Sequence, residues 1–324
     1  MREKCKLLFG VIKDIKKAGC GNFLGLFLSF LICRFYHGAS LDNFRSLRMY
    51  EYTNRKRREV LTFKRQKVIS DTLNAKASAE ELNMLMNKML FNRHFSSFIK
   101  REWLYLAGES EFFNIEKFIR ENPKFLVKPI MSTQGKNIEL KEANNLNIRE
   151  FVQEYRCKNV IIESFIRQHP VLSKINPTSV NTIRIITAVK KDKVCIVGAG
   201  LRCGGKNAFI DNFHNGGCAY PIDVETGIVS GKGVSLGSMN QLLLHPATDT
   251  VMLGLQIPYW SLILKTVSEA ALRCGNVKYI GWDIAVLEDG VEIIEANINY
   301  PGTNLVQLDG FEAYKRLKVF LREV

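Results

Sequence analysis

The sequence lacks the patterns that would place it in several common protein classes. Its eight cysteines include no C-x-x-C pair and follow no regular spacing, so neither a disulfide scaffold nor a zinc site is predicted. Reduced thiols are the expected state. No internal repeat or low-complexity segment is present. With 46% hydrophobic and 24% charged residues, the 324-residue chain is expected to fold around a sizeable core.

A long hydrophobic run is also missing. The most apolar early stretch, residues 23–35, is shorter than the ~20 residues that a membrane-spanning helix needs. No small-residue cleavage site follows it, so a secretory signal peptide is not expected. We expect a helix packed on the body of the protein, and a helix lying in a bilayer interface is the alternative.

Negative charge is scarce in one part of the chain. The formal net charge is +14, and nine basic residues between Arg45 and Lys67 face only two acidic ones. Such a segment fits a solvated helical face, an anionic membrane surface, or an acidic substrate or partner. Nucleic acid is a further polyanion that clustered basic side chains attract.

Proline is absent from the first 110 residues, and most of this region is predicted to be helical. Ser78 to Glu81 has the form of a capping box. Behind it, apolar residues recur at helical spacing and predict one apolar face, made of Leu82, Leu85, Met86, Met89 and Leu90. Lys88 falls on the opposite side.

From about residue 122 the pattern changes to short strands and turns. Strands are predicted over Pro123–Pro129, Ile138–Leu140 and Val160–Ile166. A hairpin of Thr182–Val189 and Val194–Leu201 is predicted to turn at Lys191-Asp192. A later helix is predicted over Pro258–Arg273, with proline in its first turn and Gly275 just past its end. Its core-facing stripe is expected to be Trp260, Ile263, Leu264 and Val267.

The most informative segment is a strand, turn and strand over Gly281–Asn297, with Asp289-Gly290 as the turn signal. If the loop has three residues, antiparallel pairing places Asp283 directly opposite Glu295, and Asn297 shares their face. Two facing carboxylates repel each other unless a divalent cation binds between them. Two carboxylates and an amide oxygen are hard donors that suit Mg²⁺. A solvated outer face is the alternative, and a two-residue loop would shift the register.

A second group of residues has the chemistry of a phosphate site. Lys128 ends an apolar strand, and a loop of small polar and glycine residues follows from Ser132 to Asn137. Such a loop lets backbone N–H groups approach phosphate oxygens, while a lysine supplies a point charge. Period-two alternation then puts Arg184 on the face opposite two isoleucines, and Arg202 follows on the returning strand. Two arginines near a phosphate fit clamps for developing negative charge, and solvated edge positions are the alternative.

These elements, in this order and spacing, resemble the ATP-grasp superfamily, and most closely the sugar-transfer associated ATP-grasp family. The resemblance extends from about Gly38 to the end of the chain and is carried most strongly by Phe125–Pro129, Asn181–Arg184, Gly281–Asp283 and Ile294–Asn297. It implies an α+β fold of the ATP-grasp type, in which two α+β lobes clasp the nucleotide, with a helical amino-terminal extension. The implied units are a basic helical region over 1–80, the amino-terminal part of the ATP-grasp fold with its phosphate-loop lid over 81–161, and the carboxy-terminal lobe with hinge and metal site over 162–324.

The resemblance also implies roles for individual residues. The metal ligands would be Asp283, Glu295 and Asn297, holding one or two Mg²⁺ ions that bridge the phosphates of ATP. Nucleotide contacts are implied for Lys88 and Lys128, for the mobile loop Ser132, Thr133, Gln134, Gly135 and Lys136, and for the interlobe hinge Glu163, Ser164, Phe165 and Ile166. Backbone groups of the hinge would read the adenine edge. Arg184 and Arg202 would face the transferred phosphoryl group as catalytic residues.

Two positions depart from better-known members of the superfamily. The usual ribose-binding carboxylate after the hinge is missing, and Gln168, His169 or Asn181 is the candidate substitute. Gly281 stands where peptide-forming members have an arginine, which shifts that role to Arg184 or Arg202. The residues expected to border the substrate are Asn212, His214, Asn215 and Asn299.

Three functions compete on this basis. The leading one is ligation dependent on ATP and Mg²⁺, in which a carboxylate is activated as an acylphosphate for attack by an amine or hydroxyl. The setting would be cytoplasmic modification of cell-surface polysaccharide or sugar, and the five scattered histidines fit a reaction that needs little covalent help. The second is phosphorylation of a sugar or polyol hydroxyl, with His214 either as a base or as an ordinary surface residue. The third is a non-catalytic basic scaffold that binds membrane or nucleic acid through residues 45–67. A peripheral membrane or glycan-assembly partner on that basic run is also compatible with catalysis.

Overall fold

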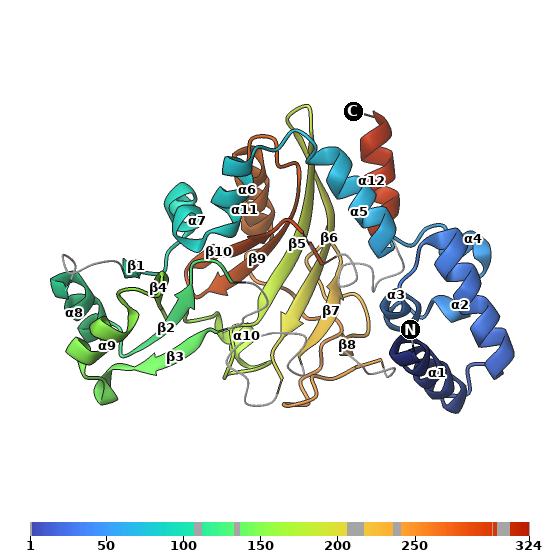
Figure 1. Ribbon diagram of the computed structural model, residues 1–324, viewed down its shortest axis with the longest axis horizontal. Coiled ribbons are helices and arrows are strands. Elements are labelled where there is room, and N and C mark those ends of the chain that lie inside the picture. Colours follow the sequence, from blue (N-terminus) through green and yellow to red (C-terminus); the bar gives the residue numbers. More distant parts are fainter. Residues whose placement is uncertain are drawn as a thin grey trace.

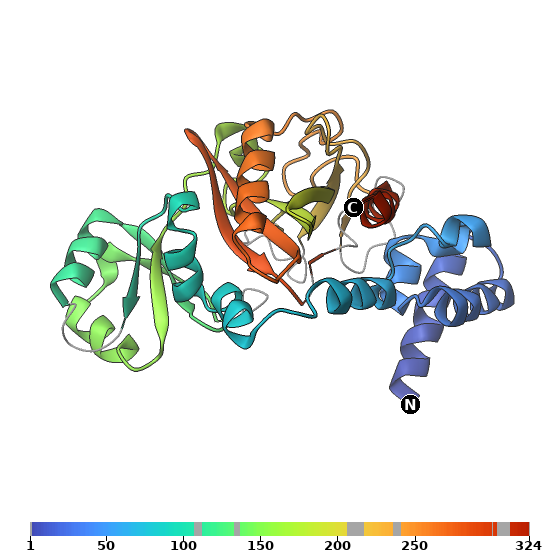
Figure 2. The ribbon, with the colours of Figure 1, turned by 90° about the horizontal axis from the view of Figure 1, so that it is seen from above.

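The protein consists of three bodies arranged in a row (Figures 1 and 2). A four-stranded sheet with its helices lies at one end, a six-stranded sheet occupies the middle, and the amino-terminal helices form the other end. The computed structural model describes residues 2–106, 112–132, 137–205, 217–235, 241–299, 301–302 and 312–323. All the strand pairs within these ranges are antiparallel, which confirms the α+β class.

The amino-terminal body is a small helical bundle. Its elements are α1 (Arg2–Lys17), α2 (Phe23–His37), α3 (Leu41–Ser46), the 3-10 turn η1 (Met49–Glu51) and α4 (Asn54–Arg57). The side chain of Asn22 caps α2 by accepting the N–H of Gly25, and Gly38 ends it with a φ of 67°. One face of α2 packs into a core that includes Ile12, Leu26, Phe30, Phe44 and Met49. The prediction of a packed helix is therefore confirmed for this face.

The link to the central body consists of α5 (Phe63–Leu73), α6 (Ala79–Met86), α7 (Lys88–His94) and the 3-10 turn η2 (Ser96–Phe98). The predicted capping box is confirmed, because Ser78 and Glu81 exchange side-chain to backbone hydrogen bonds of 3.2 and 2.8 Å. The prediction of one continuous apolar face over residues 82–90 is wrong. Helix α6 ends at Met86, and the Asn87 side chain caps a new helix by accepting N–H groups of the next turn. This break makes Lys88 the first residue of α7.

The small sheet contains β1 (Trp103–Leu106), β2 (Lys124–Pro129), β3 (Glu139–Glu142) and β4 (Val160–Ser164), in the order β1-β4-β2-β3. Helices α8 (Phe112–Glu121) and α9 (Ile148–Tyr155) pack against it, and the turn η3 (Ala143–Asn145) precedes α9. The core beneath these helices includes Phe118, Phe125, Val127, Phe151 and Ile162. Side chains alternate along a strand, so Lys128 and Glu163 lie on the other face. The three predicted strands are confirmed, although the last one ends at Ser164.

The large sheet has the order β10-β9-β5-β6-β7-β8. Its strands are β5 (Thr182–Lys190), β6 (Lys193–Cys203), β7 (Cys218–Ile222), β8 (Val234–Ser235), β9 (Tyr279–Leu287) and β10 (Gly290–Asn297). The predicted hairpin at Lys191-Asp192 is confirmed. Both turn residues have positive φ, 46° and 61°, as a two-residue turn that matches strand twist requires.

Helices cover both faces of the large sheet. On one face, α11 (Trp260–Leu272) packs against isoleucines of β5 and against Trp282, and the predicted stripe of that helix lies in this core. On the other face, α12 (Glu312–Glu323) packs against Ile186 and Tyr279. The predicted helix starts two residues late, because Tyr259 adopts a φ of 56° and Pro258 lies before the helix.

A short crossing segment joins the two sheets. Strand β4 ends at Ser164, and Gln168 already forms a bridge with Leu287 of the large sheet, ahead of the short helix α10 (Pro170–Ser173). The division of the chain into the units 1–80, 81–161 and 162–324 remains a proposal. Helices α6 and α7 pack with the core of the large sheet. Within the described ranges, none of the helices has the length and hydrophobicity that crossing a membrane requires.

Candidate active site

The hairpin β9–β10 brings Asp283 and Glu295 together by a route that differs from the expected one. The turn has two residues, because Gly290 pairs with Leu287. A loop of that length alone would move the carboxylates out of register. A β-bulge at Ile294 adds one residue to β10, and beyond it Glu295 pairs directly with Asp283. The predicted juxtaposition is confirmed, but the loop is the two-residue alternative, and the bulge restores the register that this loop would have shifted.

Two arginines converge on Asp283, which is 3% exposed. Arg184 donates from Nε and Nη2 to the two carboxylate oxygens at 2.6 and 2.9 Å, a bidentate fork. Arg202 donates from Nη1 to Oδ2 at 2.8 Å. Burial works to raise the pKa of Asp283, but the two guanidinium groups outweigh it and hold the pKa well below its usual range. The alternative of a solvated edge position is wrong for Arg184, since its side chain is buried against the carboxylate of Asp283.

The second carboxylate of the hairpin is in a different electrostatic state. Burial and the adjacent negative charge of Asp283 raise the pKa of Glu295. The Nδ2 atom of Asn297 lies 3.3 Å from Glu295 Oε1 and 3.4 Å from Asp283 Oδ2. All three predicted metal ligands therefore converge on one face of the hairpin.

Gly281 leaves room for the chain that follows the hairpin. A Cβ atom at this position would lie 2.4 Å from the carbonyl oxygen of Pro301, so no larger residue fits. The same Pro301 carbonyl accepts a hydrogen bond from Arg184 Nη1 at 3.1 Å. Arg184 of the neighbouring strand β5 thus contacts the segment that packs on Gly281, and its role in place of an arginine at position 281 stays a prediction.

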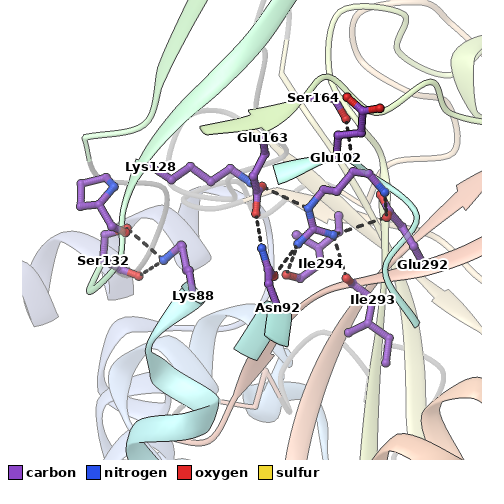
Figure 3. Close-up of polar contacts among 12 residues, drawn as sticks. Lys88, Asn92, Glu102, Lys128, Ser132, Glu163, Ser164, Glu292, Ile293 and Ile294 are labelled. Atoms are coloured by element: carbon purple, nitrogen blue, oxygen red, sulfur yellow. Dashed lines mark hydrogen bonds and ion pairs between the residues drawn. The ribbon is translucent and has the colours of Figure 1, made fainter. Parts of the chain in front are cut away.

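A second buried ion cluster lies on the small sheet (Figure 3). Lys128 Nζ donates to Glu163 Oε2 at 2.5 Å, and Asn92 Nδ2 donates to the other carboxylate oxygen at 3.1 Å. Arg101 Nε lies 3.2 Å from the same carboxylate. Burial works to raise the pKa of Glu163, but Arg101 and Lys128 hold it well below its usual range. The Glu163 side chain therefore anchors cations, a role that the hinge prediction did not include.

Arg101 links this cluster to the bulge in the large sheet, and this residue was not identified from the sequence. Its Nη1 and Nη2 atoms donate to the carbonyls of Ile293 and Ile294 at 3.0 and 3.2 Å. Its own N–H donates to the buried carboxylate of Glu292 at 2.9 Å. The donors thus bind the two residues at which the register of β10 changes. An irregular Lys-Arg-Glu sequence before a short strand offers no periodic signal that could have identified this residue.

Lys88 lies close to both clusters. Its Nζ donates to the carbonyl and hydroxyl oxygens of Ser132 at 2.7 and 3.0 Å (Figure 3). Burial lowers its pKa, while the negative charges of Glu295 and Glu163 act in the opposite direction. Both carboxylates are therefore near enough to influence this amine. Lys88, Lys128 and Ser132 form a cationic entrance to the first part of the predicted phosphate loop.

The predicted hinge coincides with the crossing between the sheets. The N–H groups of Ser164 and Phe165 donate to the carbonyls of Glu102 and Lys124 at 2.9 and 3.3 Å. These two donors are already used within the small sheet. Ile166, which follows, is half-buried.

The candidate ribose-binding residues have structural partners. Asn181 is fully buried, and its amide donates to Gln168 Oε1 and to the carbonyls of Leu172 and Asn176 at 2.9–3.1 Å. Gln168 donates to the carbonyls of Asn176 and Ser179 in turn. His169 caps α10. The predicted nucleotide contact of Asn181 is not supported, because no surface of this side chain is accessible.

Several predicted residues lie outside the described ranges. They are Thr133, Gln134, Gly135 and Lys136 of the phosphate loop, and Asn212, His214 and Asn215 of the substrate border. Asn299 is described and is exposed next to the segment that contacts Arg184.

A cluster of soft ligands that the sequence spacing did not predict lies on the core side of the large sheet. Cys203 and Cys218 pair across β6 and β7, and both are buried with His245, with ligand atoms within 4.8 Å of one another. A hydrogen bond with Cys203, and His245 after it, lower the pKa of Cys218 to about 6 against the effect of burial. Both ring nitrogens of His245 already have oxygen partners at 3.1 and 3.2 Å, Thr248 and the carbonyl of Gly204. The histidine of this cluster therefore has hydrogen-bond partners within the protein, as a structural residue would.

The donor set around Asp283 fits a hard divalent cation. Three oxygen-bearing side chains share one face, and burial together with the negative charge of Asp283 raises the pKa of Glu295. A divalent cation would compensate the second negative charge, and Mg²⁺ takes such ligands together with phosphate oxygens. Lys88 of α7 lies near enough to Glu295 for the carboxylate charge to act on the pKa of this amine.

A family model described as sugar-transfer associated ATP-grasp matches residues 64–320. This range contains both ion clusters and all the predicted site residues. No curated protein matches the chain.

Three solved structures of similar fold have low sequence identity to the chain. An L-amino acid ligase from Bacillus licheniformis is 14% identical with a TM-score of 0.43, and the match covers 72% of this chain and 49% of that one. D-alanyl-alanine synthetase A from Vibrio cholerae O1 biovar eltor is 11% identical with a TM-score of 0.46, covering 74% and 63%. The ATP-grasp ligase PsnB, in complex with a minimal precursor, Mg and ADP, is 13% identical with a TM-score of 0.40, covering 82% and 71%. The chain thus spans less than two thirds of the first two proteins, and scores at this level carry no argument about activity.

Proposed function

Since the chain belongs to the sugar-transfer associated ATP-grasp family, we propose that it is a ligase dependent on ATP and Mg²⁺. In this proposal a carboxylate is activated as an acylphosphate, and an amine or a hydroxyl then attacks it. The observation that carries the proposal is the convergence of Asp283, Glu295 and Asn297 on one face, with Arg184 and Arg202 bound to Asp283.

The three oxygen-bearing side chains would hold Mg²⁺, which supplies charge neutralisation at the phosphate oxygens when it is bound. Arg184 and Arg202 are fixed donors in a buried site, where electrostatic stabilisation of developing charge is strong because water is excluded. Their hydrogen bonds to Asp283 keep both guanidinium groups oriented before any substrate binds. The protein's contribution is then positioning and charge, as phosphoryl transfer requires.

In this proposal the nucleotide binds where the two lobes meet. Lys88 and Lys128 would contact phosphates together with the loop that starts at Ser132, since their amines already lie beside its first residue and beside Glu163. The hinge would contact the adenine through the backbone of Ile166, because the N–H groups of Ser164 and Phe165 are engaged in the small sheet.

The acceptor substrate is the least specific part of the proposal. We place the reaction in cell-surface polysaccharide or sugar modification because of the family description alone. A cytoplasmic setting fits the use of ATP and eight cysteines that are all free. A membrane or glycan-assembly partner at residues 45–67 remains a prediction, and several basic side chains there are engaged internally. Arg48 pairs with Glu51, and Arg57 and Arg65 donate to backbone carbonyls.

Binding is the first test. Titration calorimetry with a non-hydrolysable ATP analogue should show uptake that requires Mg²⁺. Glu295→Gln keeps the size of the side chain and removes the charge, so Mg²⁺-dependent uptake should weaken strongly. Asp289→Asn is the matched control, because this carboxylate lies in the exposed turn of the same hairpin and pairs with Lys100. Equal binding by wild type and Glu295→Gln would contradict the metal site.

Product analysis is the second test. Wild-type protein with ATP, Mg²⁺, candidate amino acids and uronic sugars should release ADP only when a carboxylate and a nucleophile are both present. Release with a single hydroxyl compound, together with a stable phosphorylated product, would replace ligation with a kinase activity.

A further inference from the structure

Helix α2 is apolar on two opposite faces, and only one of them is covered. Leu26, Phe30 and Cys33 pack into the core of the amino-terminal body. Leu24, Leu28, Leu31 and Phe35 follow the helical spacing of four, three and four residues on the other side. Leu24, Leu28 and Phe35 are 66%, 50% and 76% exposed, whereas Leu31 is half-buried and also packs against the core of the amino-terminal body. We call these four residues the outer stripe.

The outer stripe is unusual for a surface helix. A helix that is apolar all round is normally buried in a large core or in lipid. No acidic or basic residue interrupts the stripe over its three turns. Isolated exposed leucines need no explanation, whereas a continuous stripe indicates a contact surface.

Lysines of α1 flank the stripe on the same surface. Phe9 of α1 stacks on Phe23 and Phe27 of α2, with ring centroids 5.8 and 6.1 Å apart, so these rings mark the line of contact between the two helices. On one side of this line lie the buried residues of both helices. By helical spacing, the outer stripe lies on the other side of the line on α2, and exposed Lys6, Lys13 and Lys17 lie on that side on α1.

Positive charge also lies at the far end of the stripe. Phe35 lines a hollow of about 280 Å³ together with Tyr36, Lys64 and Arg65. Over residues 1–67 there are sixteen Lys and Arg against five Asp and Glu, so this body carries most of the formal charge of +14. The helical body that carries these groups lies at the end of the molecule farthest from the small sheet (Figure 2).

We propose that the outer stripe and its flanking lysines dock on the surface of an anionic bilayer, with α2 lying in the plane of the interface. The apolar stripe enters the headgroup boundary, and the lysines contact lipid phosphates. This surface differs from the run at residues 45–67, with which it shares only Lys64 and Arg65 at its far end. The inference does not depend on the ligase proposal, because none of its residues contacts the metal or nucleotide site.

Vesicle flotation of the full chain tests the surface. The protein should bind vesicles of phosphatidylglycerol and phosphatidylcholine and bind pure phosphatidylcholine weakly. Leu24→Gln with Leu28→Gln should reduce binding at least about tenfold, because two apolar side chains no longer enter the interface. Removing Lys6, Lys13 and Lys17 by substitution with Gln should reduce binding about fivefold per charge and weaken the preference for anionic lipid.

Control variants test whether a loss of vesicle binding is specific to the outer stripe. Val251→Gln with Leu253→Gln changes two side chains that are 65% and 55% exposed in the central body, and vesicle binding should stay unchanged. Thermal unfolding of each variant should match wild type, since the replaced side chains are exposed. Wild-type binding by the stripe variant, or loss with the lysine variant alone, would overturn interfacial insertion. A stripe-dependent dimer in sedimentation, with vesicle binding unchanged, would assign the surface to a second copy instead.

Discussion

Two buried carboxylates, Asp283 in the large sheet and Glu163 in the small sheet, each meet two cationic side chains. In both places the cations outweigh burial and hold the carboxyl pKa below its usual range. Each cluster also contains a second carboxylate, and the two differ in what that carboxylate contacts. Glu295 pairs directly with Asp283 across the hairpin, whereas Glu292 contacts Arg101, which also contacts Glu163.

In our proposal the Glu163 cluster holds the fold and the Asp283 cluster binds a cation. At Glu163, Arg101, Lys128 and the Asn92 amide all contact the same carboxylate. At Asp283 both arginines contact one carboxylate, while burial and the charge of Asp283 raise the pKa of Glu295. Perturbed pairs of this kind are typical of functional sites. Substituting one member of each cluster should therefore affect turnover at Asp283 and stability at Glu163.

The largest effect is expected on turnover at the Asp283 cluster. Glu295→Gln should lower kcat for ADP release at least about a hundredfold, because the cation that neutralises the phosphates loses a charged ligand. Asp289→Asn, in the exposed turn of the same hairpin, should leave kcat unchanged. If both variants turn over at the wild-type rate, Glu295 is not part of the site.

The next effect is on stability at the Glu163 cluster. Glu163→Gln leaves two buried cations without their carboxylate and should cost about 3–5 kcal/mol of the free energy of unfolding. Urea denaturation measures this loss, and Mg²⁺ should not restore it. The control is Glu154→Gln, whose carboxylate pairs with Lys158 at the surface, and the expected change is within ~1 kcal/mol. A rescue of Glu163→Gln by Mg²⁺ would contradict the distinction between the clusters.

A smaller effect, on the Mg²⁺ dependence of turnover, is expected for Arg101, which links the Glu163 cluster to the bulge in β10. Arg101→Lys keeps a positive charge near Glu163 but cannot donate to both the Ile293 and Ile294 carbonyls. The bulge that sets the register of Glu295 should loosen, and the Mg²⁺ concentration for half-maximal turnover should rise about tenfold. Saturating Mg²⁺ should recover most of kcat. Lys100→Gln is the matched neighbour and should change neither quantity. Lower stability with unchanged Mg²⁺ dependence would give Arg101 a structural role alone.

The smallest effect is a pH dependence at Glu163. Its folded pKa lies below that of an unfolded glutamate, which is about 4.3, so the unfolded chain binds more protons as pH falls. The stabilisation is present above that pH and is lost as pH falls toward the folded pKa. The difference in unfolding free energy between wild type and Glu163→Gln should be constant from pH 7 to about 5 and should shrink below about 4. Urea titrations at several pH values measure it, and a difference that grows in acid would reverse the sign of the interaction.

Local sequence patterns predicted most of the strands and one helix cap. Three of these features depend only on neighbouring residues, and all three are confirmed: the hairpin at Lys191-Asp192, the capping box at Ser78 and the strand that ends at Pro129. The helix break at Asn87 was missed because its apolar spacing continues across the cap. The burial of Asn181 was missed because its partners come from a loop without periodicity.

Local sequence patterns were enough to identify the two strands and the turn of the central hairpin, because alternation along a strand and turn preferences are local properties. Alternation also put Glu295 and Asn297 on one face. The register that brings Asp283 to that face was set by contacts in the folded protein. A two-residue turn is corrected by a bulge at Ile294, and Arg101, far away in the chain, binds the bulge carbonyls. The arrangement depends on contacts between distant segments, and the period of a strand carries no information about those contacts.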